Sequence, residues 1–345
     1  MTIVLAGISA INVYLSRTSL IPVHSQNECA FILNESIGST AAIAQLKTLP
    51  FYNSGIIPSA ALAGVSHEHL SVELLISCKA HRRKLPHLVN HLWQSPLFPK
   101  ALYRVNTTQT TEPLYVVSPE LHFLLRCRET RAPAQALLLA LQLCGTYELR
   151  PDIPEGFATR PVPLTCAQSL QNAVQWLPTG ARGQKIARYA ASLALDGSAS
   201  PRESGFAAFA ITSRRHGGAG LPAPRLNYEK SLSPLAKAHL PQRTSIRYDF
   251  YWPEKHLACE YDSSWWHSDP LRAGADDQRR LAARALNDDL IGVARQTLST
   301  LPTATALFDQ LAHLLQGRAP RPLSARSLAC REELFRLCFG HHSFW

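Results

Sequence analysis

The sequence predicts an α/β (α+β) protein of two domains, the second of which holds a small mixed sheet with helices packed against it. The chain has 345 residues, which is enough for two domains with sizeable cores. Its 46% of hydrophobic and 17% of charged residues describe a folded chain rather than a disordered one. Between residues 190 and 318 the patterns follow the order helix, basic loop, strand, strand, helix, strand, helix.

Residues 1–150 are predicted to form an α+β accessory or regulatory domain. The elements expected there are a strand and a helix within 1–20, a helix within 28–48, a strand over 70–77, a strand over 114–117, a helix from 119 and an apolar helix over 134–143. The strand over 70–77 follows from the alternation of Val72, Leu74 and Ile76. Ser118 as N-cap and Pro119 at the first helical position predict the helix that follows residue 117.

A linker and a helix are expected over residues 151–189, because residues 151–163 are rich in Pro. The second domain is expected over 190–318, and a basic tail over 319–345. Ser200 and Pro201 mark a helix start, with Glu203 at the capping-box position. Its further elements are expected as a basic loop over 212–247, a hairpin near 250, a helix over 276–286, a strand over 290–294 and a helix over 303–315.

The charge of the chain points to a polyanionic partner. The formal net charge is +10 and the sequence pI is about 9.4. DNA is the first candidate, RNA is not excluded, and an anionic membrane surface comes second. Residues 79–104 hold six Lys and Arg and no acid, which fits either a solvated basic loop or a contact with phosphates.

The cysteines and the hydropathy pattern indicate a cytoplasmic protein that does not span a membrane. The eight Cys include no C-x-x-C pair, and several lie within apolar runs, which is typical of buried, reduced thiols. No run of 18 apolar residues exists, so no membrane span is expected. The apolar start of the chain lacks the basic segment of a signal peptide.

A hairpin over residues 247–262 brings acids together. Two aromatic-rich runs flank a turn at 253–256. Centring that turn between residues 254 and 255 pairs residues whose numbers sum to 509, so Asp249 lies opposite Glu260. Asp262, two residues beyond Glu260, points to the same face. Opposed like charges on neighbouring strands destabilise a sheet.

Three acids on one patch repel each other unless a cation lies among them. Oxygen ligands without Cys suit a hard ion, Mg²⁺ or Mn²⁺, and the candidate ligands are Asp249, Glu260 and Asp262. The alternative is that Asp249 pairs with Arg247 or Arg243, while Glu260 and Asp262 lie on a solvated face.

The pattern Asp249, Glu260-x-Asp262, His267 and Asp276-x-x-Arg279, followed by a strand, resembles the very-short-patch-repair-like branch of the PD-(D/E)xK nuclease superfamily. The resemblance covers about 190–318 and implies a restriction-endonuclease-like mixed sheet with flanking helices. It makes Asp249 the first metal ligand and Glu260 the second. Asp262 stands where many relatives have Lys.

The resemblance assigns roles to further residues, each with an alternative. Glu203 on the preceding helix would complete the site, or it only caps that helix. His267 would transfer a proton or contact phosphate, or it is a surface histidine. Arg279 would contact nucleic acid, although pairing with Asp276 at i+3 is expected. The residues that would contact nucleic acid are Arg202, Arg214, Arg215, Arg247, Trp265, Trp266 and Arg279.

The implied chemistry is metal-dependent hydrolysis of DNA phosphodiesters by an endonuclease or nickase. One site cuts one strand, so double-strand cleavage would require a homodimer. Three departures weaken the case for catalysis. Ser263 and Asn287 stand where the family usually has Gly, and the strand that usually ends in an Arg- or Thr-containing motif reads Gly-Val-Ala-Arg over residues 292–295. The alternative is a catalytically inactive nuclease fold that acts as a DNA-binding, antitoxin-like regulator. Residues 1–150 resemble the regulatory part of abortive-infection antitoxins, which agrees with that alternative.

Overall fold

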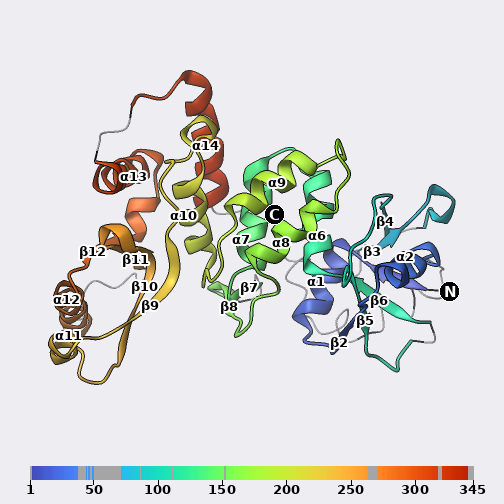
Figure 1. The fold of residues 1–345 in the computed structure, drawn as a ribbon, viewed down its shortest axis with the longest axis horizontal. Helices are drawn as coiled ribbons and strands as arrows, with labels where there is room; N and C mark the ends of the chain where they lie inside the picture. Colours follow the sequence, from blue (N-terminus) through green and yellow to red (C-terminus); the bar gives the residue numbers. More distant parts are fainter. Residues whose placement is uncertain are drawn as a thin grey trace. The chain divides into compact units, whose positions relative to one another are not determined.

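The computed structural model describes residues 2–37, 44, 46, 49, 71–85, 87–110, 112–150, 153–262, 270–317 and 321–340. The chain divides into two compact units, Met1–Ala194 and Leu195–Trp345, here named unit 1 and unit 2 (Figure 1). Both units combine helices with β-sheet, so the α+β class is confirmed.

Unit 1 contains a six-stranded sheet in the order β2-β5-β6-β1-β3-β4, and β1 runs parallel to β6 but antiparallel to β3. These strands are β1 (Ile3–Leu5), β2 (Leu20–Pro22), β3 (Val72–Ile76), β4 (Leu88–Leu92), β5 (Leu102–Val105) and β6 (Leu114–Val117). A separate pair is formed by β7 (Tyr147–Arg150) and β8 (Gly156–Thr159).

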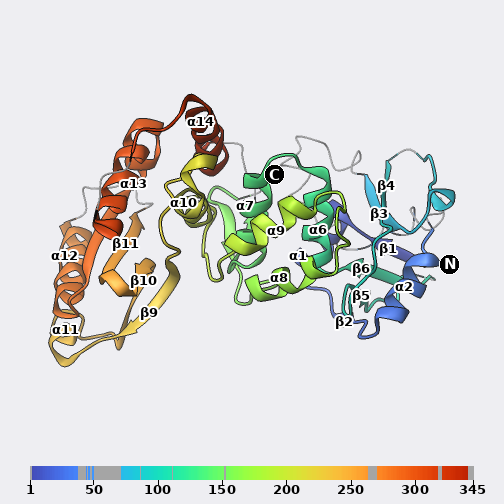
Figure 2. The same ribbon diagram turned by 45° about the horizontal axis from the view of Figure 1, so that its top comes forward.

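Of the helices of unit 1 whose bounds the structure describes, three precede β4 in the chain and four follow β6. They are α1 (Gly7–Leu15), α2 (Gln26–Asn34), η2 (Lys79–His81), α6 (Pro119–Glu129), α7 (Pro133–Leu143), α8 (Ala167–Gln175) and α9 (Gln184–Leu193). Figure 2 shows α6 to α9 gathered in one helical layer. Ser118 caps α6 by accepting a hydrogen bond from the Leu121 amide at 3.2 Å, as its sequence position predicts.

The sequence predicts most of unit 1 but misses several of its short strands. The strands β1, β3 and β6 and the helices α1, α6 and α7 lie where they are expected. Residues 79–104, expected as a basic loop, instead contribute β4 and part of β5. Residues 156–159 of the expected linker form β8. β4 pairs with β3, β5 with β6, and β8 with β7, and no local sequence pattern reveals these pairings.

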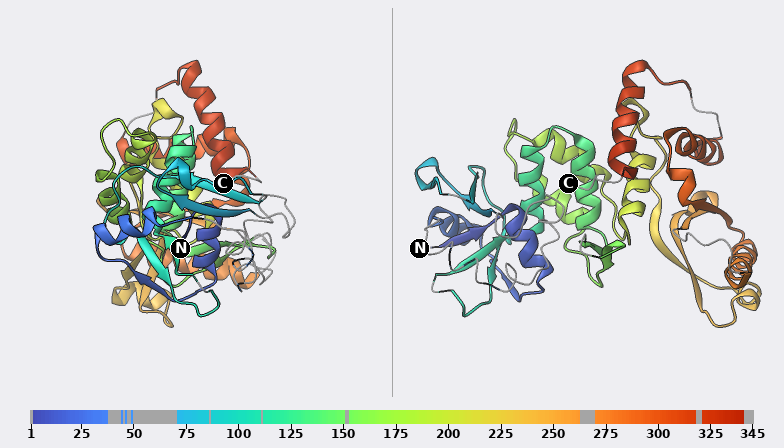
Figure 3. Two further views of the ribbon diagram at one scale, coloured as in Figure 1. Left: turned by 90° about the vertical axis from the view of Figure 1, so that its right-hand side faces the viewer. Right: turned by 180° about the vertical axis from the view of Figure 1, so that it is seen from behind.

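Unit 2 is built on a four-stranded sheet in the order β12-β11-β10-β9. Its elements are α10 (Pro201–Ile211), η3 (Arg214–His216), β9 (Arg225–Ser231), α11 (Pro234–His239), β10 (Ser245–Trp252), η4 (Pro253–Lys255), β11 (Leu257–Asp262), α12 (Pro270–Ala285), β12 (Asp289–Ala294), η5 (Arg295–Leu298), α13 (Leu301–Gln316) and α14 (Ala325–Phe339). The sheet is mixed, because β10 is antiparallel to β9 and β11 whereas β11 is parallel to β12. The right panel of Figure 3 shows this sheet with its helices from behind.

Aromatic side chains join the sheet of unit 2 to its helices. Phe250 of β10 stacks on Phe206 of α10, with ring centroids 4.1 Å apart, and Phe206 packs on Phe308 of α13 at 4.8 Å. Close contact of α10 with α14 requires Gly205, since a Cβ there would lie 2.4 Å from the Cys338 carbonyl oxygen. This core fixes α10, and with it Glu203, against β10.

The expected hairpin is present in unit 2, but the expected basic loop is not. The pairs Phe250–Cys259, Tyr251–Ala258 and Trp252–Leu257 have the predicted register. Residues 212–247 contain β9 and α11 instead of a loop. The helix expected from residue 276 begins at Pro270, and the basic tail forms α14.

The described part of the chain contains no helix both long and apolar enough to cross a membrane. Cys29, Cys127, Cys144, Cys259 and Cys338 are buried. Burial raises the pKa of the Cys29 thiol.

A buried carboxylate, Asp288, ties the sheet of unit 2 together at the start of β12. It accepts hydrogen bonds from Lys230 Nζ at 2.7 Å, the Tyr248 hydroxyl at 3.0 Å and the Tyr251 hydroxyl at 2.9 Å. His256 Nδ1 lies 3.3 Å away. The Asp288 side chain is fully buried, so these partners replace its hydration and join β9, β10 and β12.

We predict that Asp288→Ala destabilises unit 2 by about 3–5 kcal/mol, because it leaves Lys230 and two tyrosine hydroxyls without their shared acceptor. Native-state hydrogen exchange of amides in β9 to β12 measures this loss of opening free energy. Asp289→Asn, at the exposed neighbouring acid, is the matched control and should change little. Equal protection in the two variants would show that the network does not hold the sheet.

Candidate functional site

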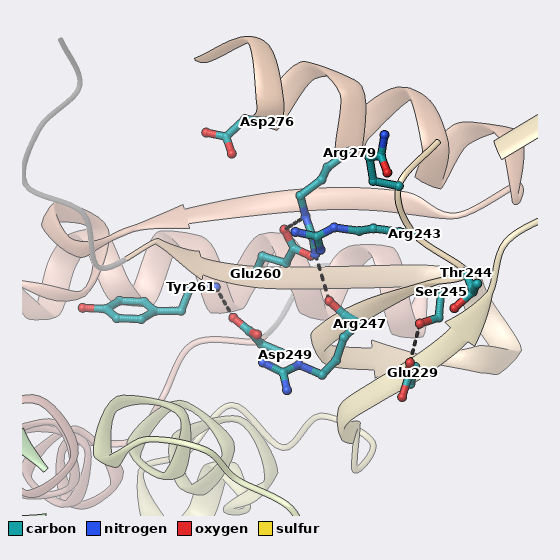
Figure 4. A pocket seen from close by; sticks show the side chains of 11 residues that line it. Glu229, Arg243, Thr244, Ser245, Arg247, Asp249, Glu260, Tyr261, Asp276 and Arg279 are labelled. Carbon is teal, nitrogen blue, oxygen red and sulfur yellow. Dashed lines mark hydrogen bonds and ion pairs between the residues drawn. The ribbon is translucent and has the colours of Figure 1, made fainter. Parts of the chain in front are cut away.

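A pocket of about 630 Å³ lies in unit 2, beside the acids of the hairpin (Figure 4). Its lining comes from β10, β11, α12, the end of β9 and the segment before β10. The lining residues are Glu229, Gln242, Arg243, Thr244, Ser245, Arg247, Asp249, Glu260, Tyr261, Asp276 and Arg279. The pocket therefore combines acids with guanidinium groups and hydroxyls.

Asp249 lies where β10 lacks regular pairing on both sides. The ladder with β11 is regular from Trp252 to Phe250 and ends there, and continuing its register places Asp249 across from Glu260. The Asp249 carboxylate instead accepts a hydrogen bond from the Tyr261 amide at 2.8 Å (Figure 4). On the other side, the pairs with β9 stop at Tyr248 and resume at Phe250. Its carboxylate thus replaces regular pairing by a side-chain contact with the neighbouring strand β11.

The environment of Asp249 favours its protonated form. Its pKa is raised to about 7, mainly by burial and next by the negative charge of Glu203. Glu260 adds to the rise, whereas the Tyr261 amide and Arg247 oppose it. A carboxyl that titrates near neutral pH in a pocket is a feature of many functional sites.

Glu203 caps α10, as one of its two expected roles requires, and its charge raises the pKa of Asp249. Ser200 Oγ accepts from the Glu203 amide at 3.2 Å and donates to Glu203 Oε1 at 3.0 Å. Glu203 Oε2 accepts from the Ala199 amide at 2.8 Å and from Asn227 Nδ2 at 2.6 Å. The side chain is buried, which raises its pKa against the effect of these donors.

Glu260 is paired with Arg279 of α12, and the expected pairing of Arg279 with Asp276 is wrong. Arg279 Nε donates to Glu260 Oε2 at 3.2 Å, and its Nη2 donates to Glu260 Oε1. The same Nη2 donates to the Arg247 carbonyl at 2.9 Å (Figure 4). Arg279 prefers Glu260, a partly buried carboxylate that it contacts in a bidentate manner, over Asp276, an exposed acid one helical turn away.

Several residues expected at the site lie elsewhere in unit 2. Arg202 donates to the Phe339 carbonyl at 2.7 Å, and Arg214 donates to the Arg321 carbonyl. Arg215 is exposed and does not line the pocket. Arg247 does line it, as expected. The Asp262 side chain, Trp265, Trp266 and His267 lie outside the described residues.

The structure also brings residues to the site that the sequence does not single out. Thr244 and Ser245 line the pocket from the segment that precedes and begins β10, beside Arg243, which the sequence offers only as an ion-pair partner of Asp249. The excess of Lys and Arg before the hairpin is the only signal that points to them. Asn227, which binds Glu203, lies within an expected loop and carries no sequence signal.

Within the described residues, no group of three or more His, Cys, Asp or Glu side chains is arranged to hold a metal ion. The chain matches no protein-family model and has no significant match among curated proteins or solved structures. The function is therefore inferred from the geometry of the acids and their hydrogen-bond partners.

We predict that the free energy of unfolding of unit 2 falls as pH rises from about 4 to about 7, and that Asp249→Asn reduces this fall. A carboxyl with a pKa of about 7 when folded, against 3.8 otherwise, binds more protons in the folded state, so its ionisation destabilises that state. The full effect at pH 7 is at most about 4 kcal/mol.

Unfolding by urea at pH 4, 5.5 and 7 measures this difference. Asp276→Asn, at an exposed acid of the same pocket, is the matched control and should follow the native curve. Parallel curves for the native chain and Asp249→Asn would show that Asp249 is ionised like an ordinary carboxyl.

Proposed function

We propose that unit 2 is a divalent-metal-dependent phosphodiesterase that acts on DNA as an endonuclease or nickase. One observation carries the proposal. The hairpin register, continued past Phe250, sets Asp249 opposite Glu260. Burial first, and then the charges of Glu203 and Glu260, raise the pKa of the Asp249 carboxyl to about 7. Such a cluster of acids is costly without a cation and suits the binding of one.

The arrangement of elements supports a restriction-endonuclease-like fold for this unit. A helix, α10, precedes an antiparallel run of β9, β10 and β11, and α12 leads into β12, which joins the sheet parallel to β11. The two acids that the PD-(D/E)xK resemblance makes metal ligands lie on adjacent strands, and Glu203 lies on the preceding helix. This order agrees with the resemblance of residues 190–318.

The donor atoms fit Mg²⁺ or Mn²⁺. Mg²⁺ in phosphoryl-transfer sites is held by one or two carboxylates and completes its shell with water and phosphate oxygens, so three protein ligands are not required. Asp249 and Glu260 would hold it, with Glu203 beside them. The bound ion would polarise the scissile phosphate and lower the pKa of an attacking water.

The chain's own residues would orient the substrate and hold the acids. Arg247 and Arg243 line the pocket with exposed side chains, where they can contact phosphates on either side of the scissile one. Arg279 holds Glu260 in place through a bidentate contact. The net charge of +10 favours a polyanion over a small neutral substrate. RNA is the alternative polyanion.

A second candidate is a DNA-binding protein that keeps the nuclease fold without catalysis. The observation in its favour is the pair of Arg279 with Glu260, which neutralises one acid of the site without any metal. Such a protein would need Arg243 and Arg247 but neither Asp249 nor Glu260.

We predict that the native chain nicks or linearises supercoiled plasmid with Mg²⁺ or Mn²⁺, and that Asp249→Ala and Glu260→Ala each reduce the rate at least about a hundredfold. Agarose gels of plasmid against time measure the rates. Glu254→Ala, at the exposed turn of the same hairpin, is the control. Salt-sensitive DNA binding without cleavage, unchanged in all three variants, would favour the non-catalytic candidate.

We also predict that Arg279→Gln tightens Mn²⁺ binding by about tenfold, because the ion no longer competes with a guanidinium for Glu260. Titration of Mn²⁺ followed by electron paramagnetic resonance measures the free ion directly. Arg280→Gln, at the neighbouring exposed arginine that pairs with Asp277, is the matched control. Weaker binding in Arg279→Gln would instead mean that Arg279 is needed to hold Glu260 in place.

A further inference from the structure

Asn227 has an unusual backbone for a residue inside a strand. Its φ is +47°, in the left-handed region, and it lies in the middle of β9. The pairs Tyr228–Tyr248 and Leu226–Phe250 flank it, so it lies across from Asp249 at the interruption of the β9–β10 ladder. A non-glycine residue with this φ is uncommon, and Asn tolerates it better than most.

The Asn227 side chain connects β9 to the acid on α10. Its Nδ2 donates to Glu203 Oε2 at 2.6 Å and to the Gly197 carbonyl at 3.0 Å. Its Oδ1 is buried and has no hydrogen-bond partner among the described residues. The amide is thus held through its nitrogen, which donates to the Glu203 carboxylate and to the Gly197 carbonyl.

Both features act on the same pair of acids. The left-handed backbone removes the strand pairing that would otherwise hold Asp249 in a regular ladder. The amide fixes the carboxylate whose charge lies beside Asp249. Asn combines tolerance of this φ with a short side-chain amide N–H, whereas Gly lacks the amide and Asp lacks the donor.

We propose that Asn227 is a positioning residue of the acidic site, which holds the Glu203 carboxylate beside Asp249 and keeps β9 from pairing with Asp249. This inference rests on the proposed phosphodiesterase function. Asn227 acts through Glu203 and touches neither substrate nor metal. Its loss should therefore affect the chemical step more than the binding of DNA.

The test compares Asn227→Gly with Asn287→Gly in plasmid nicking with Mn²⁺. Asn227→Gly keeps a residue that tolerates the left-handed backbone and removes the amide. Asn287, with φ +58°, is a left-handed Asn outside the pocket and provides the same chemical change as a control. Asn227→Asp keeps the shape of the side chain and replaces the donor by an acceptor. Thermal unfolding shows that each variant is folded.

We expect Asn227→Gly to lower kcat by about 10- to 100-fold with KM for DNA unchanged within about twofold, since a hydrogen bond to a charged group is lost. Asn227→Asp should lose at least as much, and Asn287→Gly should match the native chain. An active native chain with equal kcat in Asn227→Gly and Asn287→Gly would overturn the positioning role. A rise in KM alone would overturn it as well, because it would place Asn227 in DNA binding.

A double-mutant cycle separates this inference from the proposed function. The unfolding equilibrium constants of Asn227→Gly, Glu203→Gln and the double variant report whether the two side chains interact. We expect the double variant to fall short of the product of the single effects by at least about fivefold. Independent effects would overturn the contact itself. If the variants show coupling but the native chain neither binds Mn²⁺ nor cuts DNA, the contact stands and the phosphodiesterase function is rejected. The role of Asn227 in that function is then rejected with it.

Discussion

The register of β10 against its two neighbours places Asp249 between Asn227 and Glu260, and the acidic site depends on that register. The hairpin pairs from Phe250 to Trp252 fix it toward β11, and pairs on both sides of residue 249 fix it toward β9. Stacking of Phe250 on Phe206 then holds α10 against the same strand. A shift of the β10 register by one residue would turn the Asp249 side chain away from Glu260 and Glu203.

The acids of unit 2 differ in how far the protein compensates their charge. Asp288 is surrounded by Lys230 and two tyrosine hydroxyls, and Glu260 has Arg279. Glu203 has three donors. Asp249 has one backbone amide, and within the described part of the molecule it is the acid with a pKa near 7. The acid with the least compensation from the protein is thus a side chain that lines a pocket, and its environment favours the protonated form.

The sequence predicts the local parts of this site and misses those that depend on distant chain segments. The turn at 253–256 and the apolar runs around it are enough to derive the register that faces Asp249 with Glu260. The capping role of Glu203 follows from Ser200 three residues earlier. In contrast, β9 is hidden because its only apolar or aromatic residues are Leu226 and Tyr228, and the strand becomes evident only through its pairing with β10.

The partner of Arg279 shows the same limit. On sequence alone Asp276 is favoured, since it lies one helical turn away. Glu260 lies 19 residues away and becomes the partner because α12 brings Arg279 over the pocket. Asn227 is a stronger example, because its role arises from one backbone angle and one contact across 24 residues.

The contrast between Asp288 and Asp249 gives these observations a common physical meaning. Asp249 lies on β10 beside β9, and Asp288 lies against both strands, so side chains of these strands could neutralise or hydrogen-bond either carboxylate. At Asp288 the network joins three strands, and compensation serves stability. At Asp249 two ladders are interrupted and a second acid is held alongside, which works against stability. A cost of this kind at a pocket is expected where a cation or substrate supplies the missing charge, and the proposed function rests on that reasoning.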